Sequence, residues 1–179
     1  MNKASIKRLF KAIEVGDAPF VLSEIDNNAE ALEVVGEHNR LVRDKTPLMY
    51  AMQSNQFDIA NMLLDHGADA TAVMSGGPRT PAISLLMYFA HCDRSNFRKW
   101  VGLAKRFYDL GADPTIGLYT ALFHYSDLVP RTDLIELSLE RGGRIDVPFG
   151  DSQMTATDLV SVNRHQYTKE IYKLLKVEQ

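Results

Sequence analysis

Five histidines and one cysteine are the side chains of this 179-residue chain best suited to metal ligation or nucleophilic chemistry. The histidines, at positions 38, 66, 91, 124 and 165, are scattered, and neither an HExxH motif nor paired CxxC motifs occur. His91 and Cys92 are adjacent, but neighbouring residues of a helix point in different directions. We therefore expect no metal ligand and no catalytic residue, and we interpret His91-Cys92 as a partly buried pair near a helix end.

A second candidate for chemistry is the segment Ser75-Gly76-Gly77-Pro78, whose glycines could cradle a phosphate. The Gly-Lys-Ser/Thr sequence that completes a phosphate-binding loop does not follow it, so the segment is better explained as a turn. No Ser–His–Asp arrangement can be assigned from the spacing of these residues. The sequence thus predicts a protein that is not an enzyme and that needs no cofactor.

Composition places the chain among soluble globular proteins. It is 45% hydrophobic and 24% charged, with a net charge of −3, which gives no electrostatic reason to expect nucleic acid as a partner. No apolar run approaches the ~20 residues of a membrane span, and the N-terminal residues lack the features of a secretory signal. The single cysteine cannot form an internal disulfide, which favours a cytoplasmic location.

The elements that position these side chains come from an internal repeat. Thr46-Pro47-Leu48 is followed 21 residues after its threonine by Gly67-Ala68-Asp69, and related threonines occur at intervals of 34, 40 and 35 residues. These later starts are Thr80-Pro81-Ala82, Thr120-Ala121-Leu122 and Thr155-Ala156-Thr157. A second copy of the ending, Gly111-Ala112-Asp113, lies between them.

This pattern resembles the ankyrin repeat family, in which Thr-Pro-Leu-His-x-Ala opens a helix pair and Gly-Ala-Asp closes it. The resemblance implies an all-α fold, a solenoid of stacked helix-turn-helix units joined by hairpin-like loops. It spans one domain, residues 1–179, with a degenerate first repeat. The expected repeats are residues 4–40, 41–74, 75–115 and 116–149, followed by a C-terminal cap at 150–179.

Local physical chemistry agrees with that reading. Thr46 is suited to cap a helix N-terminus, and Pro47 suits the first helical position, where its missing N–H costs nothing. Gly67 and Gly111 stand where a helix must end through a left-handed residue. In the third repeat the glycine, Gly111, lies 31 positions after Thr80, about ten more than in its neighbours, so we expect longer helices or a longer connecting loop there.

The resemblance also implies a protein-binding surface made by the hairpin fingers and the ends of the first helices. Carried over one position at a time, with Tyr119 in a finger before Thr120, it selects Arg43, Lys45, Gln53, Arg79, Met87, Tyr88, Tyr119, Asp127 and Asp151. Tyr88 and Tyr119 could either anchor an interface or pack in the core. Core packing is favoured for Phe89 and Trp100.

Charge is distributed unevenly along the chain. Residues 12–39 contain seven acidic side chains and no lysine or arginine, whereas residues 94–106 contain five basic ones. Such runs are commonly solvated faces, but an acidic flank could also speed association with a basic partner.

The function predicted from these observations is binding of another protein without catalysis. We expect a monomer when unbound, acting as an immunity or inhibitor protein that neutralises a cognate toxin or effector. The alternative is a regulatory adaptor or a host-directed effector that uses the repeat stack as a scaffold.

Overall fold

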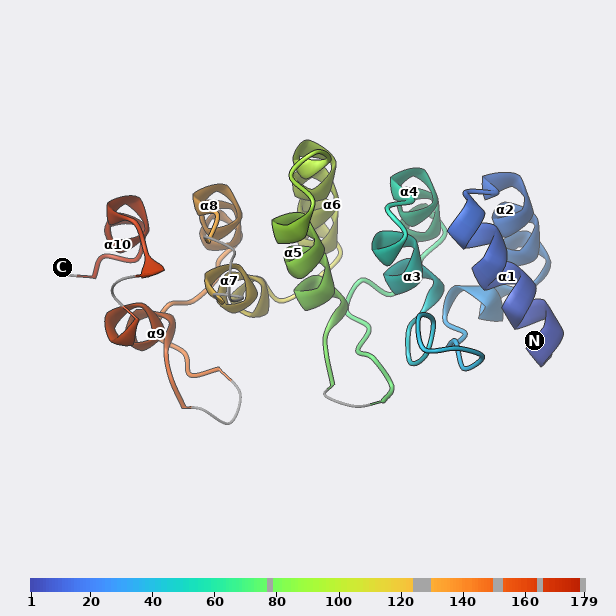
Figure 1. The fold of residues 1–179 in the computed structure, drawn as a ribbon, viewed down its shortest axis with the longest axis horizontal. Helices are drawn as coiled ribbons and strands as arrows, with labels where there is room; N and C mark the ends of the chain where they lie inside the picture. Colours follow the sequence, from blue (N-terminus) through green and yellow to red (C-terminus); the bar gives the residue numbers. More distant parts are fainter. Residues whose placement is uncertain (77–78, 124–129, 150–152, 164–165, 178–179) are drawn as a thin grey trace. The chain divides into compact units, whose positions relative to one another are not determined.

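The computed structural model describes residues 1–76, 79–123, 130–149, 153–163 and 166–177. Across these residues the chain forms ten α-helices, one short 3-10 helix and no β-strand, which confirms the all-α prediction (Figure 1). None of the described helices is long and apolar enough to cross a lipid bilayer. The chain divides into two compact units, Met1–Leu85 and Leu86–Gln179.

The first unit contains two helix pairs in two layers. Its elements are α1 (Lys3–Val15), α2 (Ala18–Asn27), the 3-10 helix η1 (Ala29–Leu32), α3 (Pro47–Gln53) and α4 (Phe57–Asp65). Each helix packs on its pair partner, and α1 also packs against α3 while α2 packs against α4 (Figure 1). The core between them is apolar and includes Leu9, Phe10, Ile13, Leu48, Ile59 and Leu63.

The second helix pair begins and ends as its residues predict. The Thr46 hydroxyl accepts a hydrogen bond from the Met49 N–H at 3.3 Å, and Pro47 occupies the first turn of α3. After α4 the backbone turns through Gly67, whose φ of +89° lies in the left-handed region that glycine adopts without strain. Both predictions from the sequence are confirmed.

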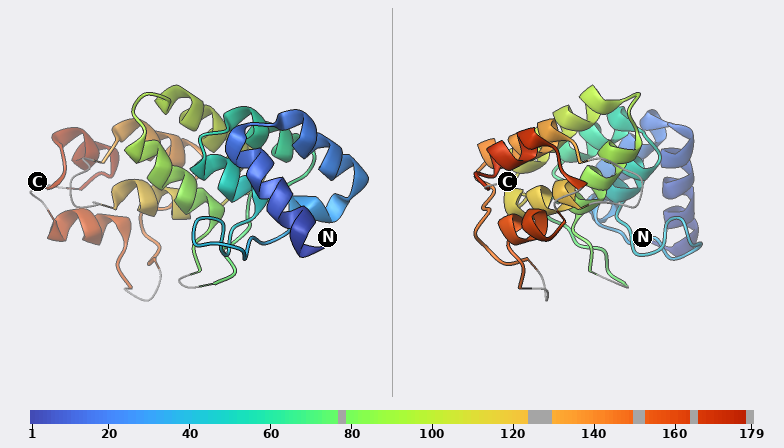
Figure 2. Two further views of the ribbon diagram at one scale, coloured as in Figure 1. Left: turned by 45° about the vertical axis from the view of Figure 1, so that its right-hand side comes forward. Right: turned by 60° about the vertical axis from the view of Figure 1, so that its left-hand side comes forward.

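The second unit contains three helix pairs. Its elements are α5 (Ala82–Cys92), which crosses the boundary between Leu85 and Leu86, α6 (Phe97–Asp109), α7 (Pro114–Leu122), α8 (Thr132–Glu140), α9 (Ala156–Val162) and α10 (Lys169–Leu174). α7 packs against α8 and α9, and α8 packs against α10, so the layered arrangement of pairs recurs in this unit (Figure 2).

The expansion of the third repeat consists of helix. α5 has 11 residues and α6 has 13, against 7 in α3 and 9 in α4. Trp100 is fully buried, its ring centroid lies 6.0 Å from that of Phe89, and its indole N–H donates to the Asp93 carboxylate at 3.2 Å. The expectation that Trp100 packs in the core is confirmed.

The start of the fourth repeat differs from the prediction. α7 begins at Pro114, where the Asp113 carboxylate accepts the Thr115 N–H at 2.7 Å. Thr120 therefore lies inside α7, buried, with its hydroxyl donating to the Ile116 carbonyl at 2.9 Å. The expected helix start at Thr120 is wrong because an Asp-Pro start directly follows the turn at Gly111 and leaves no finger between the repeats.

The last repeat begins where its threonine predicts. The Thr155 hydroxyl accepts the Asp158 N–H at 3.1 Å, and the Asp158 carboxylate accepts the Thr155 N–H at 2.9 Å. This reciprocal capping box satisfies two backbone donors at the start of α9.

Candidate protein-binding surface

The first finger, residues 36–45, is a loop closed by its own backbone. Gly36 and Arg43 form an isolated β-bridge, the Gly36 N–H donates to the Lys45 carbonyl at 3.0 Å, and the Asp44 N–H donates to the Gly36 carbonyl at 2.9 Å. A Cβ on Gly36 would lie 2.4 Å from the Val42 carbonyl oxygen, so this close approach requires glycine. The finger is therefore a fixed loop.

Lys45 and Gln53, two of the predicted binding residues, support the tip of this finger. The Lys45 ammonium donates to the Leu41 carbonyl at 3.0 Å, and the Gln53 amide donates to the same oxygen at 3.3 Å. Burial lowers the pKa of Lys45, and the Asp44 carboxylate partly opposes that shift. Leu41 itself is 58% exposed, and Arg40 and Arg43 are also exposed, so the tip presents one apolar and two cationic side chains to solvent.

The second finger, of which residues 70–76 and 79–81 are described, is joined to the first. Val73 and Pro81 form an isolated β-bridge. The Ser75 N–H donates to the Asp44 carbonyl at 3.2 Å, and the Ser75 hydroxyl donates to the Asp44 carboxylate at 3.3 Å. Asp44 has a φ of +65°, which turns both of its acceptors towards this neighbouring loop.

Both fingers extend from the same end of the first unit's helices (Figure 1). Exposed on the second finger are Val73 and the predicted binding residue Arg79. Two exposed apolar and three exposed cationic side chains thus lie on two loops that hydrogen bonds hold together. Such a surface can bind a partner through apolar contact combined with ion pairing.

Cavities between α1 and the first finger complete the surface of the first unit. The larger, of about 370 Å³, is lined by Met1, Lys3, Ile6, Val35, Glu37 and His38. A smaller one of about 120 Å³ shares His38, whose ring meets Phe10 edge-on at a centroid distance of 6.0 Å. No pattern of neighbouring residues predicted this placement of His38, because the cavity forms only once α1 lies beside the finger.

In the second unit the predicted residues separate into exposed and buried positions. Tyr88 is 38% exposed on α5, whereas Met87 is 1% exposed. The Met87 methyl group lies 3.3 Å from the point that a Cβ on Gly117 would occupy, so Met87 fills the core beside α7. It does not reach solvent because α5 continues to Cys92 instead of ending near Tyr88.

Tyr119 is buried and positions a loop. Its hydroxyl is within hydrogen-bonding distance of the carbonyl oxygens of Val147 and Met154, at 2.6 and 3.0 Å, and its ring stacks on Phe149 at a centroid distance of 4.7 Å. Burial is the main cause of a raised pKa at this hydroxyl, with the Asp158 carboxylate adding to the shift. Of the two readings of Tyr119, the structure supports core packing.

Two further predicted residues, Asp127 and Asp151, lie outside the described residues. Within the described part of the chain, no group of three or more His, Cys, Asp or Glu side chains is arranged to hold a metal ion.

Comparison with known proteins identifies one repeat in the first unit. A family model for the ankyrin repeat matches residues 43–75, which include Arg43, Lys45, Gln53, α3, α4 and the start of the second finger. A search among curated proteins found no match to the chain. Residues 43–75 thus match an ankyrin repeat, and the consecutive helix pairs described above are consistent with a stack of such repeats.

Proposed function

We propose that the chain is a non-catalytic inhibitor that binds one protein partner, as an immunity protein binds and neutralises a cognate toxin or effector. Ankyrin repeats are protein-interaction modules, and the proposal extends that general role to one inhibited partner. The binding surface in the first unit comprises the two fingers, with Leu41, Arg43, Val73 and Arg79 exposed. Tyr88 contributes a contact from the second unit.

The observation that carries this proposal is the bonding of the two fingers through Asp44 and Ser75. A surface that is already fixed loses little conformational entropy when a partner binds, so more of the contact energy appears as affinity. Lys45 and Gln53 act by holding the finger tip rather than by reaching the partner.

The acidic run of the first unit supports a partner that carries a basic patch, whereas the exposed Arg43 and Arg79 on the fingers would meet acidic groups of the same partner. The seven acidic side chains between residues 12 and 39 include Glu24, Glu30, Glu33 and Glu37, which would speed the approach of a positively charged protein. Fast and selective association suits an inhibitor that must reach a toxin before the toxin acts.

The test is affinity capture of the tagged chain from its native cells, followed by mass spectrometry of the retained proteins. We expect one stoichiometric partner whose activity falls when the purified chain is added. The variant Leu41→Asp combined with Arg43→Glu should lose about tenfold or more in affinity, because both changes fall on the finger tip. The control is Val15→Asp, since Val15 is 62% exposed but lies at the end of α1.

Equal binding by the finger variant and the control would place the interface elsewhere. A captured partner whose activity is unchanged by binding would instead support the alternative, a regulatory adaptor or host-directed effector.

A further inference from the structure

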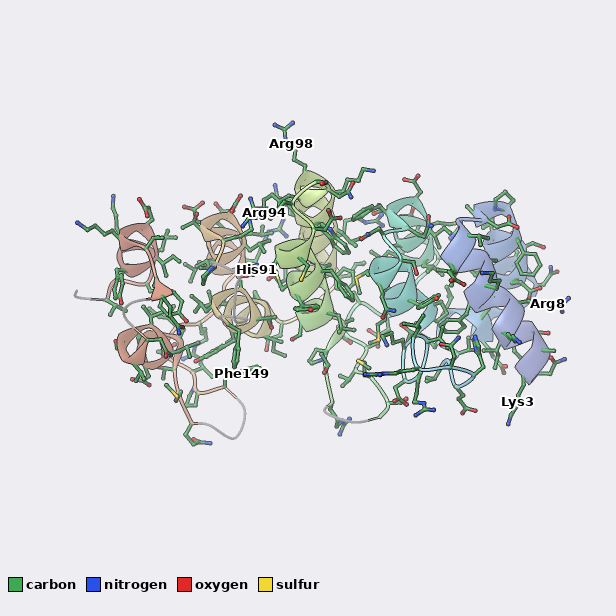
Figure 3. The ribbon with its side chains drawn as sticks, in the orientation of Figure 1. Lys3, Arg8, His91, Arg94, Arg98 and Phe149 are labelled. Carbon is green, nitrogen blue, oxygen red and sulfur yellow. The ribbon has the colours of Figure 1, made fainter. Side chains whose placement is uncertain are left out.

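Two adjoining cavities in the second unit lie where the turn between α5 and α6 meets the start of α8. One, of about 410 Å³, is lined by Arg94, Pro130, Arg131, Thr132 and Asp133. The other, of about 450 Å³, is lined by residues 94–99 and by Arg131. The two cavities share Arg94 and Arg131, and we call their combined surface the arginine cleft. It lies at the end of the helices opposite to Phe149 and its loop, with Arg98 projecting outward from the start of α6 (Figure 3).

The cleft carries an excess of positive charge. Arg94, Arg98 and Lys99 come from a short segment, and Arg131 joins them from the start of α8. Among the described residues, Arg94 and Arg98 form no ion pair, and both are exposed. These two guanidinium groups are available to an anionic ligand.

The acidic groups beside the cleft are already engaged. The Asp93 carboxylate accepts hydrogen bonds from the Asn96 amide at 2.8 Å and from the Trp100 indole at 3.2 Å. Asp133 pairs with Arg131 at 3.4 Å, while the Arg131 guanidinium lies over the Phe97 ring, 3.2 Å from its centroid. Stacking on Phe97 and the hydrogen bonds from the Nε and Nη2 of Arg131 to Asp133 hold this side chain in place in the cleft.

The N-termini of two helices add to the positive electrostatic potential of the cleft. α6 and α8 both start at the cleft, and neither has a side-chain hydrogen bond at its N-cap. The N–H groups of each first turn and the positive end of the helix dipole therefore reinforce the arginines.

The shape of the cleft favours several linked anionic groups over one small anion. Two adjoining cavities that share Arg94 and Arg131 match successive carboxylates of an extended chain, because each arginine presents a planar fork of donors to a carboxylate. We propose that the arginine cleft binds an acidic, Asp/Glu-rich segment of a protein partner. The proposal rests on the proposed function in that it assumes a protein partner, and it adds a second contact surface distinct from the fingers.

The test uses a defined probe: a fluorescein-labelled peptide of alternating glutamate and alanine, with a glutamine version as the uncharged comparison. Fluorescence anisotropy at low salt should show binding of the glutamate peptide and none of the glutamine peptide. Arg94→Ala combined with Arg98→Ala should weaken binding about tenfold or more, because two charge-assisted contacts are lost. Both side chains are exposed, so the variant should keep its far-UV circular dichroism.

The matched control is Lys3→Ala combined with Arg8→Ala, which removes the same charge from α1 in the first unit (Figure 3). We expect its affinity for the peptide to stay within about twofold of the unchanged protein, since neither Lys3 nor Arg8 lines the arginine cleft. The amide signals of residues 94–99 and 131–133 should shift in ¹H–¹⁵N spectra when the peptide is added.

Equal weakening in both variants would overturn the proposal, because it would show attraction by overall charge alone. Binding of inorganic phosphate at the same amides without binding of the peptide would also overturn it, in favour of a free anion. Neither result tests the proposed function, because binding of the partner by the fingers is measured separately with the Leu41→Asp, Arg43→Glu variant. The captured partner could be lost from the finger variant and retained by the Arg94→Ala, Arg98→Ala variant. That result would show that the fingers bind the partner and that the arginine cleft does not.

Discussion

At the residue scale, one hydrogen bond inside the second unit depends on a glycine. The Tyr108 hydroxyl lies 2.7 Å from the Ser138 hydroxyl, and Ser138 donates to the Leu134 carbonyl at 2.9 Å. Tyr108 therefore donates to Ser138, and burial raises the pKa of Tyr108 to about 12. A Cβ on Gly117 would lie 2.0 Å from the Tyr108 hydroxyl oxygen, so only glycine fits beneath this side chain.

Gly117→Ala should lower the free energy of unfolding by about 1–3 kcal/mol, because either the tyrosine or α7 must move. In a Tyr108→Phe background the nearest ring atom, Cζ, is 3.0 Å from the same point, so the added cost of Gly117→Ala should shrink. Urea unfolding of the two single variants and the double variant measures this coupling.

Gly102→Ala is the control: nothing lies within 4 Å of its Cβ position in α6, and it should stabilise the protein by about 0.5–1 kcal/mol. If Gly117→Ala and Tyr108→Phe change the free energy of unfolding by strictly additive amounts, the steric explanation is wrong.

His91 is the residue whose titration should affect stability near neutral pH. It is 3% exposed, and neither ring nitrogen has a hydrogen-bond partner among the described residues. Burial lowers the pKa of His91, and the charge of Arg131 lowers it further. The pKa of His91 is lower in the folded state than in the unfolded state. Its contribution to the free energy of unfolding is therefore fully present above the unfolded pKa of about 6.5 and is lost as the pH falls through the folded-state pKa.

We therefore expect His91→Leu to remove part of the loss of stability between neutral and mildly acidic pH. Urea unfolding of both proteins over this range measures the difference, and the gap between them should change most below the unfolded pKa of about 6.5. Two parallel curves would mean that His91 does not titrate differently in the folded and unfolded states.

At the scale of the element, the position of α7 is decided by its cap. Asp113 and Pro114 directly follow the turn at Gly111, so the helix begins there and Thr120 falls in its interior. This start also turns Tyr119 into the core, where it holds the loop before α9. The start of α7 at Pro114 thus determines that the Tyr119 side chain is buried rather than exposed to solvent.

Asp113→Ala should destabilise the protein by about 1 kcal/mol, because the Thr115 N–H loses its acceptor. Glu136→Ala, at an exposed position inside α8, removes a carboxylate that caps nothing and should change stability by less than about 0.5 kcal/mol. Thermal or urea unfolding distinguishes the two variants. An Asp113→Ala protein as stable as the control would argue for a helix start other than Pro114.

At the scale of the whole molecule, the division into two compact units predicts regional stability. Repeat proteins derive stability from each repeat and its immediate neighbours, so damage to one core need not spread evenly. Leu63 in the first unit and Leu134 in the second are both fully buried, which makes them a matched pair.

Leu63→Ala should cost about 2–5 kcal/mol and lower amide hydrogen-exchange protection mainly in residues 1–85. Leu134→Ala should have the reciprocal effect, mainly in residues 86–179. Exchange measured by mass spectrometry on both variants tests this expectation. A uniform loss of protection along the chain in both cases would show that the molecule unfolds as a single cooperative body.

The sequence by itself determined the features that depend on neighbouring residues. Thr46 and Thr155 cap helices, Gly67 and Gly111 end them through left-handed backbone, and the repeat at residues 43–75 matches its family model. These outcomes follow from interactions within one helical turn, so the spacing of residue types was enough to predict them. The assignment of Arg43 and Arg79 to a partner surface stays a prediction.

Only the tertiary structure decided which distant residues meet. Asp44 joins Ser75 across 31 positions, His38 meets Phe10 beside a cavity, and Arg131 completes a cleft begun by Arg94. Such contacts are set by how helix pairs pack against one another and by where each helix starts. No short stretch of sequence encodes either property, because the free energy that decides it is shared among many side chains of the core.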